Sequence, residues 1–153
     1  MNVELINPFI KASKDILHQM ANMPCEMGKI FTREGSFDGS EVMIFIGLTG
    51  ELKGQAILGM QEEVAKKIVS NMMGGMEIAA LDDIAKSAIS ELGNMVLGNA
   101  ATLIYNKGIT IDITPPTLLI GEKLSVSTSS KQTITVPLNT DYGIIELDIA
   151  IKE

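Results

Sequence analysis

The stretch DIAKSAISELGNMVLGNAATLIY, residues 83–105, carries the strongest pattern in this chain. Apolar residues recur in it at the spacing of three and four that is typical of a helix covering a core. Asp82 or Asp83 can cap its first turn, and Asn106 and Gly108 suit its end. The stretch therefore predicts one long helix. The residues expected on its core face are Ile84, Ala85, Ala88, Ile89, Leu92, Met95, Val96 and Leu103.

A second stripe of this helix lies almost opposite the apolar face and holds only polar or small residues. Its members are Ser87, Glu91, Asn94, Gly98 and Ala101, at alternating steps of four and three. Glu91 and Asn94 are therefore neighbours on the helix surface. A carboxylate can pair with a lysine of another protein, and a carboxamide can both donate and accept hydrogen bonds, so it can hold a water molecule. The spacing alone also occurs on ordinary solvated helix faces, so a site and a plain surface both stay open.

Two β-hairpins are expected, one on each side of this helix in the sequence. Residues 40–60 carry apolar side chains on both faces of a strand, which predicts a strand buried on both sides and a return strand. Residues 131–151 predict a second hairpin, and in its last strand Glu146 and Asp148, with Lys152 just after it, alternate with apolar residues and are expected to face water.

Two further helices complete the expected fold. Asn7 and Pro8 are typical of a helix start and predict a helix over residues 8–22. Residues 61–73 combine an apolar stripe with opposite charges four residues apart, which predicts another helix. A helix precedes each hairpin, which indicates a helix-plus-hairpin repeat. The expected class is α/β, of the α+β-like kind: a long, largely antiparallel sheet covered by helices, in a single domain of residues 1–153.

The composition excludes several function classes. The net charge is −7, with 12 basic residues against 19 acidic ones and no basic run. Nucleic acid and anionic membrane surfaces both require a basic patch, so neither is an expected partner. No stretch is long and apolar enough to span a membrane, and the first residues lack the features of a signal peptide. Cys25 is the only cysteine and is expected to be a structural thiol, which favours a reducing compartment, the cytoplasm.

The long helix resembles the signature helix of the CheC/CheX/FliY family of response-regulator phosphatases. That signature is an Asp or Ser, three residues, a Glu, two residues and an Asn, with a Pro some way downstream. Ser87, Glu91 and Asn94 match it in type and spacing. The family spacing leads to Thr117, and Pro115–Pro116 stands immediately before that residue. The first hairpin and the helix after it also fit the family pattern, so the resemblance covers most of the chain.

The resemblance implies a CheC/CheX-like fold and a protein phosphatase that hydrolyses the aspartyl phosphate of a CheY-like response regulator. It implies that Asn94 is the catalytic amide that orients the attacking water, and that Glu91 pairs with a lysine of the regulator. Ser87 and Gly98 are expected to contact this phosphorylated partner. The Mg²⁺ of the reaction belongs to the regulator, so the chain is expected to need no metal or cofactor of its own.

One site per chain is expected. CheC-type proteins resemble a duplication with two signature helices, and here the N-terminal helix offers Asp15 and His18 at the matching positions. Because His18 replaces the amide, this helix is expected to be degenerate or structural. One site is typical of the CheX branch, whose members resemble symmetric dimers joined through sheet strands. A homodimer is therefore expected, in line with the commonest form of oligomer.

Two other interpretations stay open. The flagellar switch proteins share this general fold and use it to bind rather than to hydrolyse, so a non-catalytic interaction domain is the main alternative. The intact acid–amide pair favours the enzyme. A self-contained small-molecule enzyme is the third interpretation, but the chain contains no P-loop, no G-x-S-x-G motif and only one histidine.

Overall fold

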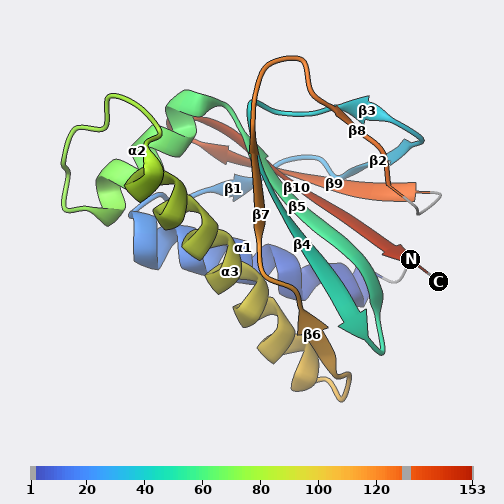
Figure 1. Cartoon of the computed structure of the whole chain (residues 1–153). Helices are drawn as coiled ribbons and strands as arrows, with labels where there is room; N and C mark the ends of the chain where they lie inside the picture. The colour runs from blue at the N-terminus through green and yellow to red at the C-terminus, as the bar shows by residue number, and fades with distance from the viewer. Residues whose placement is uncertain (1–2, 129–131, 153) are drawn as a thin grey trace.

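The long helix is present with the predicted bounds as α3, Asp83–Tyr105, in the computed structural model, which describes residues 3–128 and 132–152. The side chain of Asp82 accepts a hydrogen bond from the backbone N–H of Ala85 at 2.9 Å. This cap satisfies one of the donors that a helix start leaves free. In Figure 1, α3 runs beside α1, Val3–Ala21, and the two helices pack against each other on the same side of the sheet.

The start of α1 differs from the prediction. The helix begins at Val3, and Pro8 lies inside it rather than at its first turn. A proline this close to a helix N-terminus removes only one backbone hydrogen bond. The added turn places Ile6 in the core, where it is 2% exposed, and this burial favours the longer helix. The third helix, α2, Glu62–Met72, agrees with its prediction to within one residue at each end.

The sheet is antiparallel and is built around the two predicted hairpins. The first consists of β4, Val42–Gly50, and β5, Lys53–Met60, and the second of β9, Gln132–Thr140, and β10, Gly143–Lys152. Because β5 pairs with β10, the two hairpins form one sheet, in the order β1–β9–β10–β5–β4–β6. The predicted class, a long antiparallel sheet covered by helices, is confirmed, and each half contains a helix followed by a hairpin. Residue 131 of the second predicted hairpin lies outside the described residues.

Short strands extend or cover this sheet. The strands β1, Glu26–Met27, and β2, Phe31–Glu34, pair with β9, whereas β6, Ile111–Ile113, and β7, Thr117–Ile120, pair with β4. A separate pair is formed by β3, Phe37–Asp38, and β8, Ser125–Val126. The pairing with β4 fixes β7 at an edge of the sheet, where it lies next to α3.

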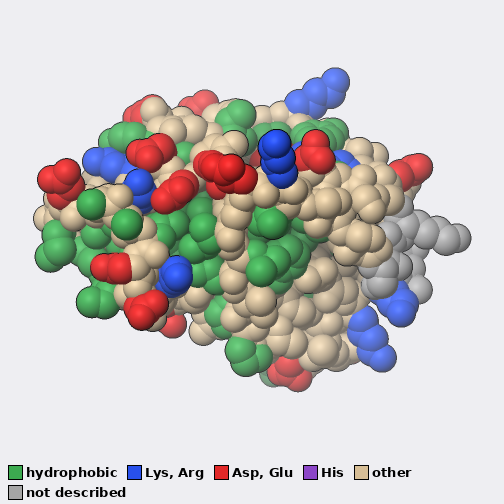
Figure 2. Space-filling model, turned by 45° about the horizontal axis from the view of Figure 1, so that its top comes forward, with side chains coloured by type: hydrophobic (Ala, Val, Ile, Leu, Met, Phe, Trp, Pro, Cys, Tyr) green, Lys and Arg blue, Asp and Glu red, His purple; other side chains and the backbone are tan. Residues whose placement is uncertain are grey.

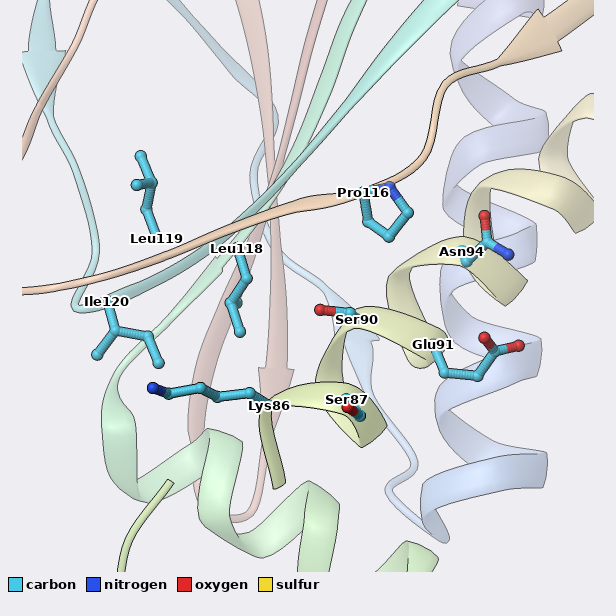
Figure 3. Close-up of a pocket in the computed structure, with 9 residues that line it drawn as sticks. All are labelled: Lys86, Ser87, Ser90, Glu91, Asn94, Pro116, Leu118, Leu119 and Ile120. Atoms are coloured by element: carbon cyan, nitrogen blue, oxygen red, sulfur yellow. The ribbon is translucent and has the colours of Figure 1, made fainter. Parts of the chain in front are cut away.

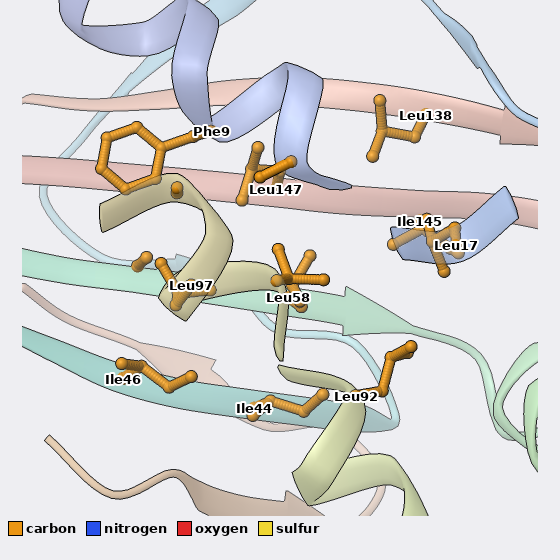
Figure 4. Close-up of a cluster of buried hydrophobic side chains, with 14 of the residues drawn as sticks. Phe9, Leu17, Ile44, Ile46, Leu58, Leu92, Leu97, Leu138, Ile145 and Leu147 are labelled. Atoms are coloured by element: carbon orange, nitrogen blue, oxygen red, sulfur yellow. The ribbon is translucent and has the colours of Figure 1, made fainter. Parts of the chain in front are cut away.

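The main core lies between the helices and one face of the sheet (Figure 4). Side chains of α1 and α3 meet side chains of the four long strands there, all of them almost fully buried. The labelled members are Phe9, Leu17, Ile44, Ile46, Leu58, Leu92, Leu97, Leu138, Ile145 and Leu147. This contact fixes the orientation of α3, and with it the direction of the opposite stripe.

Gly93 is the point where α3 comes closest to β4. A Cβ atom at this position would lie 2.7 Å from Cγ2 of Ile44, a side chain that is 1% exposed. The sequence analysis left Gly93 out of the core face, because glycine contributes no apolar side chain to a periodic pattern. Since Gly93 stands between Glu91 and Asn94, its close contact also sets the position of that pair.

Gly93→Ala is expected to lower the free energy of unfolding by about 1–3 kcal/mol, because the added methyl overpacks a stiff, buried β-branched side chain. Gly98→Ala, the same change five residues along the same helix, is expected to raise it by up to about 1 kcal/mol. Nothing lies within 4 Å of a Cβ atom at Gly98, so only the gain in helix propensity remains. Urea unfolding of both variants measures the two effects, and a stability gain in both would contradict the close contact.

The side of β10 that carries Glu146, Asp148 and Lys152 was predicted to face water, and this prediction is wrong for Asp148. Asp148 is 5% exposed and accepts a hydrogen bond from the hydroxyl of Thr135 at 2.6 Å. Glu146 forms an ion pair with Arg33 at 2.8 Å, whereas Lys152 is exposed as predicted. Burial raises the pKa of Asp148 to about 6, against the lowering effects of the Thr135 hydrogen bond and the Arg33 charge. The strand β2 lies beside β9 in the sheet, and its Arg33 side chain reaches Glu146 on this face.

Candidate functional site

A hollow of about 640 Å³ lies between α3 and the segment that contains β7 (Figure 3). Its two walls come from different elements: α3 supplies polar residues, and the β7 segment supplies apolar ones. The lining residues are Lys86, Ser87, Ser90, Glu91, Asn94, Pro116, Leu118, Leu119 and Ile120. Three predicted site residues, Ser87, Glu91 and Asn94, therefore lie on one concave surface.

Glu91 and Asn94 project from the outer side of α3 (Figure 3). Glu91 is exposed and Asn94 is half-buried. Within the described part of the chain, neither side chain has a hydrogen-bond or ion-pair partner. The residues between them, Leu92 and Gly93, are buried against the sheet, so the pair stands on a backbone that is held in place. The two polar groups are thus oriented by the fold but remain free to contact another molecule.

Gly98 continues the stripe beyond the hollow. It does not line the hollow, and the space over its Cα is open. Ala101, one turn further along, is partly exposed. The stripe beyond Asn94 therefore carries no bulky side chain, which would let the backbone of a second protein approach α3 closely.

Ile84 was predicted to lie on the core face of α3, and this prediction is wrong. It is 68% exposed, and its position three residues before Ser87 places it on the polar stripe rather than opposite to it. The predicted core face included Ile84 because it is apolar, and it left out Leu97, Ala100 and Ile104, which are buried.

The sequence analysis also missed several residues of the hollow. Ser90 stands three residues after Ser87 and four before Asn94, and Lys86 stands four before Ser90, so a broader stripe would have included them. The apolar residues of β7 had no such signal, because only the pairing of β7 with β4 brings them beside α3. Pro116 was noted as the proline of the family signature, and it does line the hollow.

The N-terminal helix differs from α3 at the matching positions. Asp15 forms an ion pair with Lys11 at 2.7 Å, and His18 is exposed at the end of α1. Neither residue lines the hollow. Over residues 3–128 and 132–152, no group of three or more His, Cys, Asp or Glu side chains could hold a metal ion.

Cys25 is buried, with 8% of its surface exposed. Burial raises the pKa of its thiol above the ordinary value, although the nearby charge of Lys14 acts in the opposite direction. A thiol in this state is a poor nucleophile. Among the helices that the structure describes, none is both long and apolar enough to cross a membrane.

Comparison with solved structures defines the class of the fold. A CheC-like superfamily protein from Shewanella sp. PV-4 has the same fold with a TM-score of 0.91 and 29% identity, over 100% of both chains. The CheX chain in the crystal structure of a CheX–CheY–BeF₃–Mg²⁺ complex from Borrelia burgdorferi matches with a TM-score of 0.82 and 32% identity. That match covers 99% of this chain and 100% of the other. The fold is therefore that of the CheC-like superfamily.

Sequence comparison identifies the family within that class. Residues 42–139 match the family described as chemotaxis phosphatase CheX. The CheY-P phosphatase CheX of Thermotoga maritima is 36% identical over 126 residues, which are 82% of this chain and 81% of that protein. The chain belongs to the chemotaxis phosphatase CheX family, and the family predicted from the signature helix is confirmed.

Proposed function

We propose that this chain is a protein phosphatase that hydrolyses the aspartyl phosphate of a CheY-like response regulator. The observation that carries this proposal is the acid–amide pair Glu91 and Asn94, unpartnered within the described residues and fixed on a helix in a CheX-family fold. The T. maritima relative is named a CheY-P phosphatase, and the B. burgdorferi relative was crystallised with CheY, BeF₃ and Mg²⁺. Both names agree with a regulator as the substrate.

Asn94 acts on the attacking water. Its amide oxygen accepts a hydrogen bond from the water, and its amide N–H₂ can donate one, so the water is held with a lone pair toward the phosphorus. The water oxygen bonds to phosphorus while the bond from phosphorus to the aspartyl oxygen breaks. The aspartate leaves as a carboxylate with that electron pair, and the water protons depart with inorganic phosphate. Such a displacement depends mainly on positioning and charge stabilisation.

Glu91 and its neighbours bind the regulator. The exposed carboxylate of Glu91 pairs with a lysine of the regulator and aligns Asn94 with the phosphate. Ser87 and Gly98 lie on either side of this pair along α3, and their small size allows the regulator to come close. A partner that covers this stripe also excludes water from the pair, which strengthens the electrostatic contacts.

The Mg²⁺ of the reaction is supplied by the regulator. Among the residues that line the hollow, Glu91 is the one carboxylate, and neither His nor Cys is present. A protein Mg²⁺ site usually combines carboxylates with phosphate oxygens and water. The donor set of this hollow does not make such a site, whereas an acyl phosphate on the regulator provides the phosphate oxygens.

Glu91→Gln is expected to raise KM for the phosphorylated regulator about tenfold, because the amide keeps the shape of the side chain but loses its charge. The value of kcat at saturation should change much less, since Asn94 is untouched. Initial rates of phosphate release over a range of regulator concentrations measure both constants. A fall in kcat with an unchanged KM would contradict a docking role for Glu91.

The proposed activity is tested with a CheY-like regulator charged by acetyl phosphate in the presence of Mg²⁺. The chain is expected to accelerate the release of inorganic phosphate in proportion to its concentration. A regulator that binds the chain but loses its phosphate at the spontaneous rate would instead identify a non-catalytic interaction domain.

We propose further that residues 1–153 act as one domain, and that the chain works in the cytoplasm as a homodimer. Two features support the compartment: the proposed substrate is a cytoplasmic response regulator, and the one cysteine of the sequence, Cys25, is a buried free thiol. Two-fold symmetric pairs are the commonest oligomers. Sedimentation equilibrium is expected to give twice the chain mass of 16.4 kDa, and a mass of one chain would exclude the dimer.

A further inference from the structure

The wall of the hollow opposite Glu91 and Asn94 is apolar. Leu118 and Ile120 pair in register with Ile44 and Val42, so they share the side of the sheet that faces α3. In Figure 3 both side chains point toward α3, whereas Leu119 points to the other side of the strand. Ile120 remains 40% exposed although it lies beside the core. The fold thus leaves an apolar surface open at one end of the hollow.

Lys86 adds a positive charge at the same end. Its side chain extends from α3 toward Ile120 in Figure 3, away from Asn94. Over the described ranges, Lys86 is exposed and has no ion-pair partner. On the face drawn in Figure 2, Lys and Arg side chains are scattered among acidic and hydrophobic side chains and form no extended patch. A lone ammonium beside an apolar wall is suited to one acidic side chain rather than to a polyanion.

Ile84 is a further exposed apolar residue near this end of α3; it lies on the stripe of Ser87 and Glu91 and does not line the hollow. It lies two residues before Lys86 and is 68% exposed, which is unusual for an isoleucine on a helix that packs on a sheet. Such exposed apolar residues around a small set of polar groups are typical of a protein contact surface. Two parts of one hollow are therefore distinct in chemistry: an acid and an amide at one end, and an ammonium with aliphatic side chains at the other.

We infer that Leu118, Ile120 and Lys86 form a second contact site for the phosphorylated regulator, which takes an aliphatic side chain next to an acidic one. This inference rests on the proposed function. The partner at the second site is taken to be the same regulator, because the residues of β7 and Lys86 line the same hollow as the acid–amide pair. A regulator aligned on Asn94 must also cover this end. The second site supplies affinity and selects among regulators, and Asn94 supplies the chemistry.

The test separates KM from kcat for release of phosphate from a Mg²⁺-loaded, acetyl-phosphate-charged regulator. Ile120→Ser is expected to raise KM about tenfold, and Lys86→Met about fivefold with a weaker dependence of KM on salt. Neither change should alter kcat by more than about twofold. Ile120→Leu and Lys86→Arg, which keep the aliphatic surface and the charge, are expected to restore KM.

Ile144→Ser is the matched control. Ile144 is 54% exposed at the start of β10 and does not line the hollow, so KM should stay at the value of the unchanged chain. Urea unfolding of each variant shows whether it is folded. An unchanged KM in folded Ile120→Ser and Lys86→Met, or an equal rise in Ile144→Ser, overturns the second site. No acceleration by the unchanged chain overturns the proposed function instead, so the two failures are distinguishable.

Discussion

Asn94→Ala is expected to lower kcat for the phosphorylated regulator about 100-fold while KM stays within about twofold. In the proposed mechanism the amide contacts the attacking water and not the resting regulator, so its loss should remove an interaction that matters only as the water attacks. A factor of about 100 corresponds to about 2.7 kcal/mol of the activation barrier, the size found for single positioned donors in other enzymes. Steady-state phosphate release over a range of regulator concentrations gives both constants.

Asn99→Ala is the control for this variant. Asn99 is the same residue type on the same helix, five positions further along, and does not line the hollow. Its removal is expected to leave both kinetic constants close to those of the unchanged chain. Equal losses of kcat in the two variants would mean that α3 is perturbed as a whole, and that Asn94 has no special role.

Asp148→Asn is expected to raise the free energy of unfolding by about 3 kcal/mol at pH 7 to 8. The pKa of Asp148 is about 6 in the folded chain, above its ordinary value of 3.8, because burial penalises the charged carboxylate. A raised pKa contributes stability that is fully present below about pH 4 and is lost as the pH rises through 6. A pKa difference of about 2 corresponds to about 3 kcal/mol. Asparagine cannot ionise, and its amide oxygen can still accept the hydrogen bond from Thr135.

Urea unfolding between pH 4 and pH 8 measures this effect. The stability difference between Asp148→Asn and the unchanged chain should be small at pH 4 and grow through pH 6. Arg33 and Glu146 also face this carboxyl, and both are kept in the comparison. Asp141→Asn, the same change at an exposed residue of the same hairpin, should leave the pH profile unaltered. A constant difference for Asp148→Asn at every pH would contradict the raised pKa.

The sequence was informative wherever a regular period extended over many residues. The helix 83–105 was predicted to the residue, because an apolar period, a capping aspartate and closing polar residues all agree there. The stripe of Glu91 and Asn94 follows from the same period. The hairpins followed from alternation, although alternation along β10 could not show that Asp148 is buried and accepts a hydrogen bond from Thr135.

Contacts between distant segments account for what the sequence did not predict. The second wall of the hollow depends on the pairing of Leu118 with Ile44, which are 74 positions apart. Gly93 and Ile84 were misjudged for related reasons: the glycine is buried because it lacks a side chain, and the isoleucine is exposed although it is apolar. A binary pattern of apolar and polar residues places the isoleucine in the core and leaves the glycine out of it. Both residues are neighbours of stripe residues on α3.

The central claim is that Asn94 promotes attack on the phosphate of a bound regulator, and a single-turnover measurement tests it most directly. Phosphorylated, Mg²⁺-loaded regulator is mixed with an excess of the chain sufficient to bind all of it, and the loss of phosphate is followed with time. We expect rapid decay with the unchanged chain, and decay close to the spontaneous rate with Asn94→Ala although the same fraction of regulator is bound. Equal decay rates in the two complexes would contradict the claim.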